Sequence, residues 1–437
     1  MRFSAVISVA IASLMSGAVY ADNLYDIYSL AQTKDPVILQ IKANRDIARE
    51  AVNEVNAAKL PQISIQGDTH YIKTNKHDSG TAYVAGGNIS LRQAIWHHEN
   101  FINSSIAEKQ ATVMDLNYNY NLQNLILRTC TAYFNVLEAQ DILEFKKANR
   151  DALKRRYDES NQKFAVGLIA NTDVQEAKAA FDLATAQVII AENNLANRFE
   201  NLRQITGIDH KNLAALDISR FSTPGVKNDA KYWMNTAEEN NIDLQAKMLE
   251  KEIAKDQISL AQTGHEPTLD LYGQLGSQYT DYKENNLAKE DGTINSGVIG
   301  LELNLPLYTG GAVSSKVEQA KLNYVAAGEA LENAHRTVQT ALYSQYNNIN
   351  ASIGTVAAYA QTVTSAQSAL DATESGYDVG TRTIVDVLDA TDKLYNAKSN
   401  LASARYNYIL SWLNLRFTSG LLSEEDVKII NSGLVKQ

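Results

Sequence analysis

The longest patterned segments of the chain are expected to be helices. Apolar residues recur in alternating steps of three and four from Leu122 to Leu143, from Val174 to Leu195 and from Val387 to Tyr408. This repeat averages about 3.5 residues and favours long helices packed as a left-handed coiled coil. The pattern predicts four long helices, at about 100–165, 172–207, 313–377 and 385–420.

Shorter helices are expected before the long ones. A helix over about 24–58 has a counterpart over about 230–264, and each ends close to a proline, which cannot continue a helix. Gly167 and Gly380 follow the two outgoing long helices, at positions where a helix exit usually needs a positive φ. Each outgoing helix should therefore turn at its glycine into a returning helix.

The chain contains an internal duplication. The motif that ends at Gly167 recurs 213 residues later at Gly380, and the same offset carries Asp173 to Asp386. A shared offset at several positions indicates two copies of one structural unit. The two predicted repeats cover about 22–225 and 226–437.

Between the helices, each repeat contains two runs in which apolar and polar residues alternate. The four runs are about 62–72, 83–95, 267–282 and 297–308. Their lengths suit tilted strands that cross a membrane, and aromatic residues stand at both ends, as expected where rings meet lipid headgroups. The aromatic residues are Tyr71, Tyr83, Tyr279 and Tyr282 towards the loops, and Trp96 and Tyr308 towards the helices.

Four strands cannot close a sheet on themselves, and an open edge in lipid leaves backbone groups without partners. Three chains would supply twelve strands, so the expected fold is mainly α with a β-barrel portion. Long α-helical hairpins form a coiled-coil α-barrel, and four transmembrane strands per chain close a 12-stranded barrel in a homotrimer. The alternative is a soluble sheet with one face on the helices.

Residues 1–21 have a basic start, a short apolar core and small residues before Asp22, which is typical of a secretory signal peptide. An N-terminal membrane anchor is the alternative, although three serines interrupt the apolar core. After Asp22 no stretch reaches the roughly 18 apolar residues of a membrane-spanning helix. The mature chain is therefore expected to be periplasmic, released or inserted as a barrel.

Composition narrows the function further. The chain has 50 acidic and 40 basic residues among 437 and a net charge of −10, with no basic cluster for nucleic acid. Cys130 is the single cysteine, which excludes an intramolecular disulfide framework and a cysteine-rich zinc module.

No enzymatic motif emerges from the sequence. There is no Gly-x-Ser-x-Gly elbow and no phosphate-binding Gly-Lys-Ser/Thr loop. His97, His98 and Glu99 lack the spacing of a helical zinc site and lie at a strand end, and Cys130 falls in an apolar heptad stretch. We expect no enzyme activity, no cofactor and no metal.

Several segments resemble a known family. These are YDVGTRTIVDVLDAT from Tyr377, FAVGLIANTD from Phe164 and PLYTGG from Pro306. They are similar to the TolC-type family of outer-membrane efflux and secretion channels, and the resemblance spans nearly all of the mature chain.

The resemblance implies a homotrimer in the outer membrane of a Gram-negative cell, with a long α-helical tunnel in the periplasm. It implies docking with a periplasmic adaptor (membrane fusion) protein and an inner-membrane transporter of RND, ABC or MFS type. The chain would then be a passive exit duct for efflux or type I secretion, whose periplasmic tip opens when helices untwist. The alternative function is a soluble periplasmic coiled-coil scaffold or adaptor.

The resemblance also assigns roles near the tip. Asp386 and Asp389 would form acidic rings at the constriction, while Tyr377 and Arg382 would link to Thr172 and Asp173 to hold it shut. The residues themselves allow a local explanation, because acids in a first helical turn complement the helix dipole and Thr383 could cap the helix with Asp386.

Overall fold

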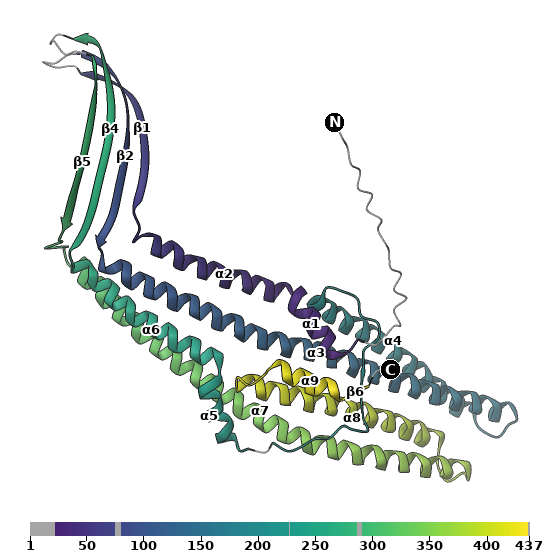
Figure 1. The fold of residues 1–437 in the computed structure, drawn as a ribbon. Helices are drawn as coiled ribbons and strands as arrows, with labels where there is room; N and C mark the ends of the chain where they lie inside the picture. The colour runs from purple at the N-terminus through teal and green to yellow at the C-terminus, as the bar shows by residue number, and fades with distance from the viewer. Residues whose placement is uncertain (1–21, 75–79, 227, 286–290, 436–437) are drawn as a thin grey trace, which may run out of the picture. The chain divides into compact units, whose positions relative to one another are not determined.

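The computed structural model describes residues 22–74, 80–226, 228–285 and 291–435, so the predicted signal peptide at 1–21 lies outside the described residues. Two compact units are present, each assembled from separate segments (Figure 1). Among the described residues, the first unit comprises those within 22–39, 122–237 and 341–435, and the second comprises those within 40–121 and 238–340. The units therefore cut across the two sequence repeats, because the long outgoing helices contribute to both.

The long helices lie close to their expected ranges. They are α3 (His98–Ala165), α4 (Asn171–Thr206), α7 (Ala312–Asp378) and α8 (Ile384–Thr418). The heptad positions of α4 and α8 are buried or half-buried, as are those of α3 within the first unit. Their burial confirms that the period of three and four marks the packed faces of these helices.

The prediction of single helices over 24–58 and 230–264 is wrong, because a break divides each of them. The observed elements are α1 (Leu24–Lys34), α2 (Pro36–Ala57), α5 (Ala230–Asn240), α6 (Ile242–Gln262) and the short helix η1 (Thr263–His265). Asp35 Oδ1 accepts from the Ile38 N–H at 2.9 Å, and Asn241 Oδ1 accepts from the Leu244 N–H at 3.1 Å. Each break is therefore a new helix start with its own N-cap.

The N-terminal cap of α2 carries an additional ion pair. Asp35 is 1% exposed, and its Oδ2 lies 3.1 Å from Nη1 of Arg128 on α3. A buried carboxylate needs such a partner. In the second repeat the cap is the neutral Asn241, and the position equivalent to Arg128 is Ala341, so the charge and its partner are replaced together.

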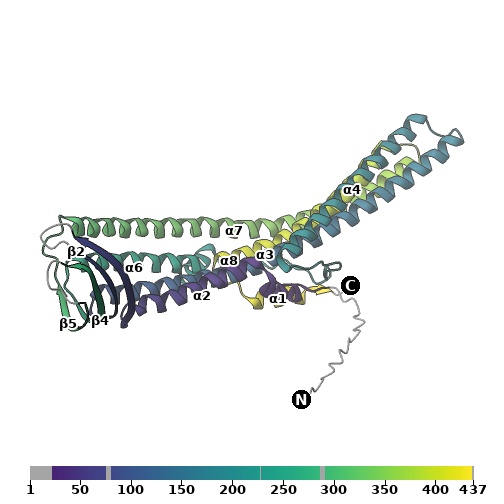
Figure 2. The same cartoon turned by 90° about the horizontal axis from the view of Figure 1, so that it is seen from above.

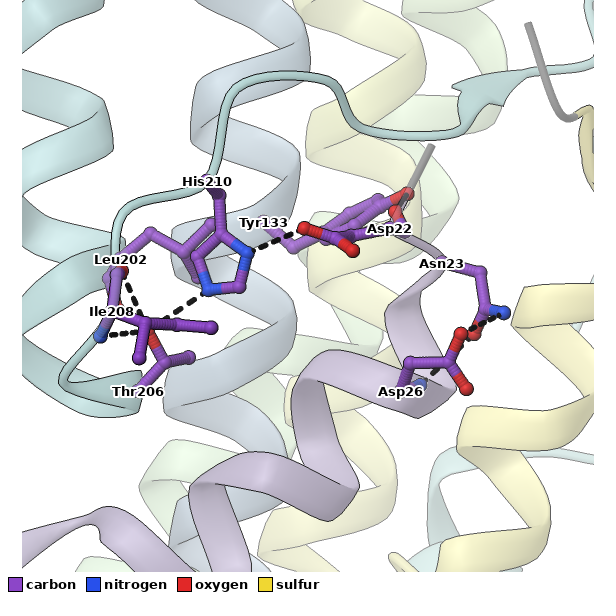
Figure 3. A network of polar contacts seen from close by, with 8 residues as sticks. All are labelled: Asp22, Asn23, Asp26, Tyr133, Leu202, Thr206, Ile208 and His210. Carbon is purple, nitrogen blue, oxygen red and sulfur yellow. Dashed lines mark hydrogen bonds and ion pairs between the residues drawn. The ribbon is translucent and has the colours of Figure 1, made fainter. Parts of the chain in front are cut away.

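A buried histidine ties the start of the described chain to the first unit (Figure 3). Nδ1 of His210 lies 2.7 Å from Oδ2 of Asp22, and Nε2 lies 2.9 Å from Oγ1 of Thr206. The Asp22 N–H donates to the Asn212 carbonyl at 2.9 Å, and the Tyr133 hydroxyl donates to the Ala214 carbonyl at 2.6 Å. Burial raises the pKa of Tyr133, so this hydroxyl remains a donor.

The contacts from Thr206 to His210 and from His210 to Asp22 resemble a catalytic triad, in which a hydroxyl nucleophile is paired with a histidine base that an acid orients. Thr206 is fully buried, however, and its hydroxyl also lies 3.2 Å from the Leu202 carbonyl. A nucleophile must be reachable by substrate. The network is therefore a structural contact that holds Asp22 against the turn after α4.

The first unit is completed by its C-terminal segment. Helix α9 (Glu424–Ser432) packs against α1, and β6 (Leu434–Val435) pairs with β3 (Ala215–Leu216). Nε of Arg416 on α8 lies 2.9 Å from Oδ1 of the buried Asp426. The end of the chain is therefore anchored by both an ion pair and a strand pair.

In the second unit the strands form one antiparallel sheet in the order β1-β2-β4-β5, which curves visibly in Figure 2. The strands are β1 (Gln62–Thr74), β2 (Gly80–Trp96), β4 (Thr268–Asn285) and β5 (Gly292–Asn304). The sheet does not close within the protomer, so β1 and β5 are its two edges.

The strands differ from the expected ranges of 62–72, 83–95, 267–282 and 297–308. At the loop ends the ladder continues beyond the apolar runs, with Thr74 opposite Gly80 and Thr280 opposite Gly292. Backbone pairing needs no apolar side chain, so alternation underestimates these ends. At the other end β5 stops at Asn304, before Pro306, which has no N–H to donate to a ladder.

The register separates two faces of the sheet. Ile63 lies opposite Leu91, and Gly273 lies between Leu91 and Ile299 in neighbouring strands, so these residues share one face. We call this the apolar face; its larger side chains are Ile63, Ile65, Ile89, Leu91, Leu271, Leu275, Ile299, Leu301 and Leu303. The opposite, polar face includes Gln62, Ser64, Asn88, Ser90, Arg92, Gln274 and Glu302.

The apolar face is exposed in the protomer, since Ile65 is 77% exposed and Ile299 is 76% exposed. A contiguous exposed apolar surface of this kind marks a membrane or protein contact. In the described ranges, no helix has a stretch long and apolar enough to cross a bilayer.

Candidate functional site

The two long hairpins end in similar turns. Gly167 follows α3 and Gly380 follows α7, and both have a φ of 76°. The Gly167 N–H donates to the Phe164 carbonyl at 2.8 Å, and the Gly380 N–H donates to the Tyr377 carbonyl at 3.0 Å. A side chain at either glycine would be strained, so both repeats use the same device to reverse direction.

The hairpin ends pack together in the first unit. Ala177 and Ala184 of α4 lie in one buried cluster with Ile384 and Leu388 of α8 and Leu153 of α3. The predicted tip residues are therefore mounted on a packed helical framework.

Asp386 occupies the N-terminal capping box of α8. Its Oδ2 accepts from the N–H and the hydroxyl of Thr383, each at 2.9 Å, and its own N–H donates to Thr383 Oγ1 at 3.3 Å. These hydrogen bonds hold the pKa of Asp386 below its ordinary value, and the bond from the Thr383 backbone has a larger effect than the bond from its hydroxyl. The carboxylate therefore stays charged at neutral pH.

Asp389 lies three residues further along α8 and is exposed. In the described part of the chain it has no hydrogen bond or ion pair. The capping explanation therefore accounts for Asp386 but gives Asp389 no local role.

The four predicted link residues are not joined to one another in the protomer. Arg382 and Thr172 are exposed, whereas Asp173 and Tyr377 are half-buried. Tyr377 packs against the cluster of Ile384 and Leu388, and Nζ of Lys163 lies 4.6 Å from the centre of its ring. Within the described ranges, no hydrogen bond or ion pair connects Tyr377 or Arg382 with Thr172 or Asp173.

A different set of contacts connects the outgoing helix α3 with α7 and α8. Arg156 of α3 pairs with Glu374 of α7, and its Nη1 also donates to Glu159 at 3.0 Å. Nδ2 of Asn149 donates to Asp392 of α8 at 3.2 Å. The sequence pattern did not predict this connection. A possible signal was the position of Glu374, which lies three residues before Tyr377 and therefore on the same side of α7.

The predicted interfacial aromatic residues fall on different faces. Tyr71, Tyr83 and Tyr279 share the apolar face near the loops, and the rings of Tyr71 and Tyr83 are 4.9 Å apart. Tyr282 lies opposite Ala82 on the polar face, and Tyr308 follows β5 with 89% of its surface exposed.

Trp96 reaches the apolar face through a bulge. Ala94 lies opposite Asp270 and Trp96 opposite Leu269, so Ile95 has no partner residue. Strict alternation from Arg92 would have placed Trp96 on the polar face. The extra residue shifts the alternation by one position and so places Trp96 on the apolar face.

The described residues contain no group of histidine, cysteine and carboxylate side chains arranged to bind a metal ion. His97 Nε2 lies 3.1 Å from Asp270, and His98 Nδ1 lies 2.8 Å from Glu266. Cys130 is fully buried, and burial raises the pKa of its thiol to about 12. These groups join structural elements, and the thiol is not poised as a nucleophile.

The sequence matches the family described as outer membrane efflux protein over residues 27–208 and 233–421. The chain belongs to the outer membrane efflux protein family. It is 44% identical over 430 residues to outer membrane protein TolC of Vibrio cholerae serotype O1, covering 98% of this chain and 97% of that protein. It is also 26% identical to proteases secretion protein PrtF of Dickeya chrysanthemi, covering 98% of this chain and 94% of PrtF.

Solved structures agree on the fold. The CmeC outer membrane channel of Campylobacter jejuni has a TM-score of 0.78 at 18% identity, covering 94% of this chain and 90% of that one. Members of the outer membrane efflux protein family are passive channels and not enzymes. This member is an outer-membrane exit duct for efflux and type I secretion.

Proposed function

We propose that three copies of the chain close the sheet into a twelve-stranded barrel that opens the duct through the outer membrane. The observation that carries this proposal is the pair of unpaired sheet edges, β1 and β5, on a sheet with an exposed apolar face. An edge in lipid is costly because its N–H and C=O groups find no water. Pairing β5 of one copy with β1 of the next removes every edge, turns the apolar face to lipid and turns the polar face to the lumen.

A soluble scaffold is a weaker explanation of the same sheet. It would have to cover the apolar face, where Ile65 and Ile299 are more than 70% exposed, with another protein. Lipid covers this face without any further assumption.

The hairpin ends form the periplasmic gate of the duct. In a trimer Asp386 and Asp389 become six carboxylates around the axis, which attract cations and repel anions. Like-charge repulsion raises the pKa of ringed carboxyls, but the Thr383 hydrogen bonds oppose this for Asp386. The ring formed by Asp386 is therefore charged at neutral pH.

The gate is held shut in two ways. Arg156 and Glu374 join α3 to α7 within each protomer. In the assembled trimer, Tyr377 and Arg382 link to Thr172 and Asp173 to restrain the tip, although these residues are not joined within a single protomer. Opening requires these contacts to break as α7 and α8 untwist.

The duct receives its substrates from an inner-membrane transporter of RND, ABC or MFS type through a periplasmic adaptor protein. The family membership and the similarity to PrtF support a role in both efflux and secretion. Energy comes from the transporter, because the duct is passive.

Cross-linking tests the closure by three copies. A cysteine at Ile65 on β1, combined in turn with one at Ile299, Leu301 or Leu303 on β5, should give a covalent trimer under oxidation at the matching register. Cys130 is buried and should not interfere. The control pair, Ile65 with a cysteine at Ile89, lies directly opposite on neighbouring strands of one chain and should give only monomers. Failure of all β1–β5 pairs to link different chains would contradict the proposal.

A further inference from the structure

A lysine that forms no ion pair with the described residues lies among aromatic rings where the sheet meets the helices. Lys59 lies between α2 and β1, and its Nζ is 5.2 Å from the centre of the Phe101 ring on α3. The Phe101 ring lies 6.3 Å from that of Trp96, which the bulge places on the apolar face. The three side chains therefore form one continuous group, which we call the boundary cluster.

The boundary cluster is accessible in the protomer and continuous with the apolar face. Trp96 is 51% exposed, Phe101 52% and the neighbouring Leu60 60%. Trp96 lies opposite Leu269, at the end of the apolar face nearest the helices. Tryptophan at this level is typical of the boundary between acyl chains and headgroups.

The charge of Lys59 is not neutralised by the protein. Its Nζ donates to Asn56 Oδ1 at 3.0 Å, which uses one of its three N–H donors. No acidic side chain in the described ranges forms an ion pair with Lys59.

The backbone around Lys59 is fixed. Nε2 of Gln93 on β2 donates to the Lys59 carbonyl at 2.6 Å, and the Lys59 N–H donates to the Asn56 carbonyl at 3.0 Å. Asn56 Oδ1 also accepts from the Ser104 hydroxyl of α3 at 2.9 Å. The backbone of Lys59 is thus held beside the strand end, and Asn56 holds its ammonium group by one hydrogen bond.

We propose that the boundary cluster binds one phospholipid of the periplasmic leaflet in each protomer. The phosphodiester oxygens accept hydrogen bonds from the two remaining N–H donors of Lys59. The rings of Trp96 and Phe101 cover the glycerol region, and an acyl chain extends along Leu60 onto the apolar face. Continuity with the apolar face and the opposite charge of a lipid phosphate favour this occupant over a peptide. This assignment rests on the proposed function, which places the apolar face in lipid.

The test is lipid retention by the intact trimer. The protein is reconstituted with phosphatidylethanolamine and phosphatidylglycerol, extracted, and the lipids bound per trimer are counted by native mass spectrometry at increasing detergent. Lys59→Gln should weaken retention roughly five-fold per site, the effect of one lysine at a lipid surface. Lys59→Arg keeps the charge and should retain lipid, whereas Trp96→Leu should lose it in part.

Lys42→Gln is the matched control, because Lys42 is an exposed lysine on α2, the helix that precedes Lys59, and forms no ion pair within the described ranges. It should retain lipid as the parent does. Equal retention by Lys59→Gln and the parent, or equal loss in Lys42→Gln, would overturn the assignment. Trimer mass and channel conductance are measured on the same samples, so a failure of the proposed function would show as their loss in the parent protein.

Discussion

Replacing Asp386 and Asp389 together by asparagine is expected to abolish the cation preference of the channel and its block by multivalent cations. In the proposed trimer this removes six carboxylates from the proposed gate. The amide oxygen of an asparagine in place of Asp386 can still accept the hydrogen bonds of Thr383 at the start of α8. The reversal potential in a planar bilayer under a salt gradient should move towards that of a neutral pore.

The same preference should depend on pH with a defined sign. The pKa of Asp386 is lowered in the folded chain, so the carboxylate and its capping contribution are present above its ordinary pKa and are lost as pH falls through the lowered value. The contribution of Asp386 to selectivity should therefore be present at neutral pH and be lost as the pH falls through this lowered pKa.

Two other acids provide the control for this experiment. Glu176→Gln with Asp182→Asn removes two exposed charges from α4, the repeat counterpart of α8, and should leave selectivity unchanged. Unchanged selectivity in the variant that lacks Asp386 and Asp389 would show that these residues only cap and solubilise the helix.

Arg156→Gln is expected to raise the resting conductance by loosening the closed tip. Arg156 is 21% exposed and pairs with Glu374, which joins α3 to α7 in each protomer. A partly exposed pair contributes about 1 kcal/mol, so three equivalent pairs bias the closed state by about 3 kcal/mol, or roughly a hundred-fold. Single-channel recording at low voltage measures the open fraction directly.

Exchanging the two charges distinguishes the effect of losing the Arg156–Glu374 ion pair from a general loss of stability. Arg156→Glu combined with Glu374→Arg should restore the closed state, at least in part. Arg150→Gln removes an arginine of the same helix whose one ion pair among the described residues is with its neighbour Asp151, and it should leave conductance unchanged. If Arg156→Gln stayed as closed as the parent, the pair would stabilise the protomer without holding the gate.

The sequence was sufficient for the helical layout because burial in long helices follows a regular period. Val174, Ala177 and Leu394 are buried where the period of three and four placed them. The break at Asp35 could also have been read from the chain, because an acid before a proline is a strong helix-start signal. Its counterpart at Asn241 lacks the proline and carries a weaker signal.

Other features depend on tertiary register and could not be obtained from alternation alone. Trp96 reaches the apolar face only because Ile95 bulges. The pair of Arg156 and Glu374 joins residues more than 200 positions apart, on helices that nothing in the local pattern brings together. Conversely, the capping role of Asp386 was visible locally because Thr383 and Asp386 lie within one turn.

The central claim is that a single copy leaves the two edge strands of its sheet, β1 and β5, without hydrogen-bonding partners. The mass of the purified protein tests this claim most directly. Sizing in detergent with simultaneous single-channel recording should give one species of three times the protomer mass that inserts into bilayers as an aqueous pore. A monodisperse single-copy protein, stable in buffer without detergent and silent in bilayers, would contradict the account.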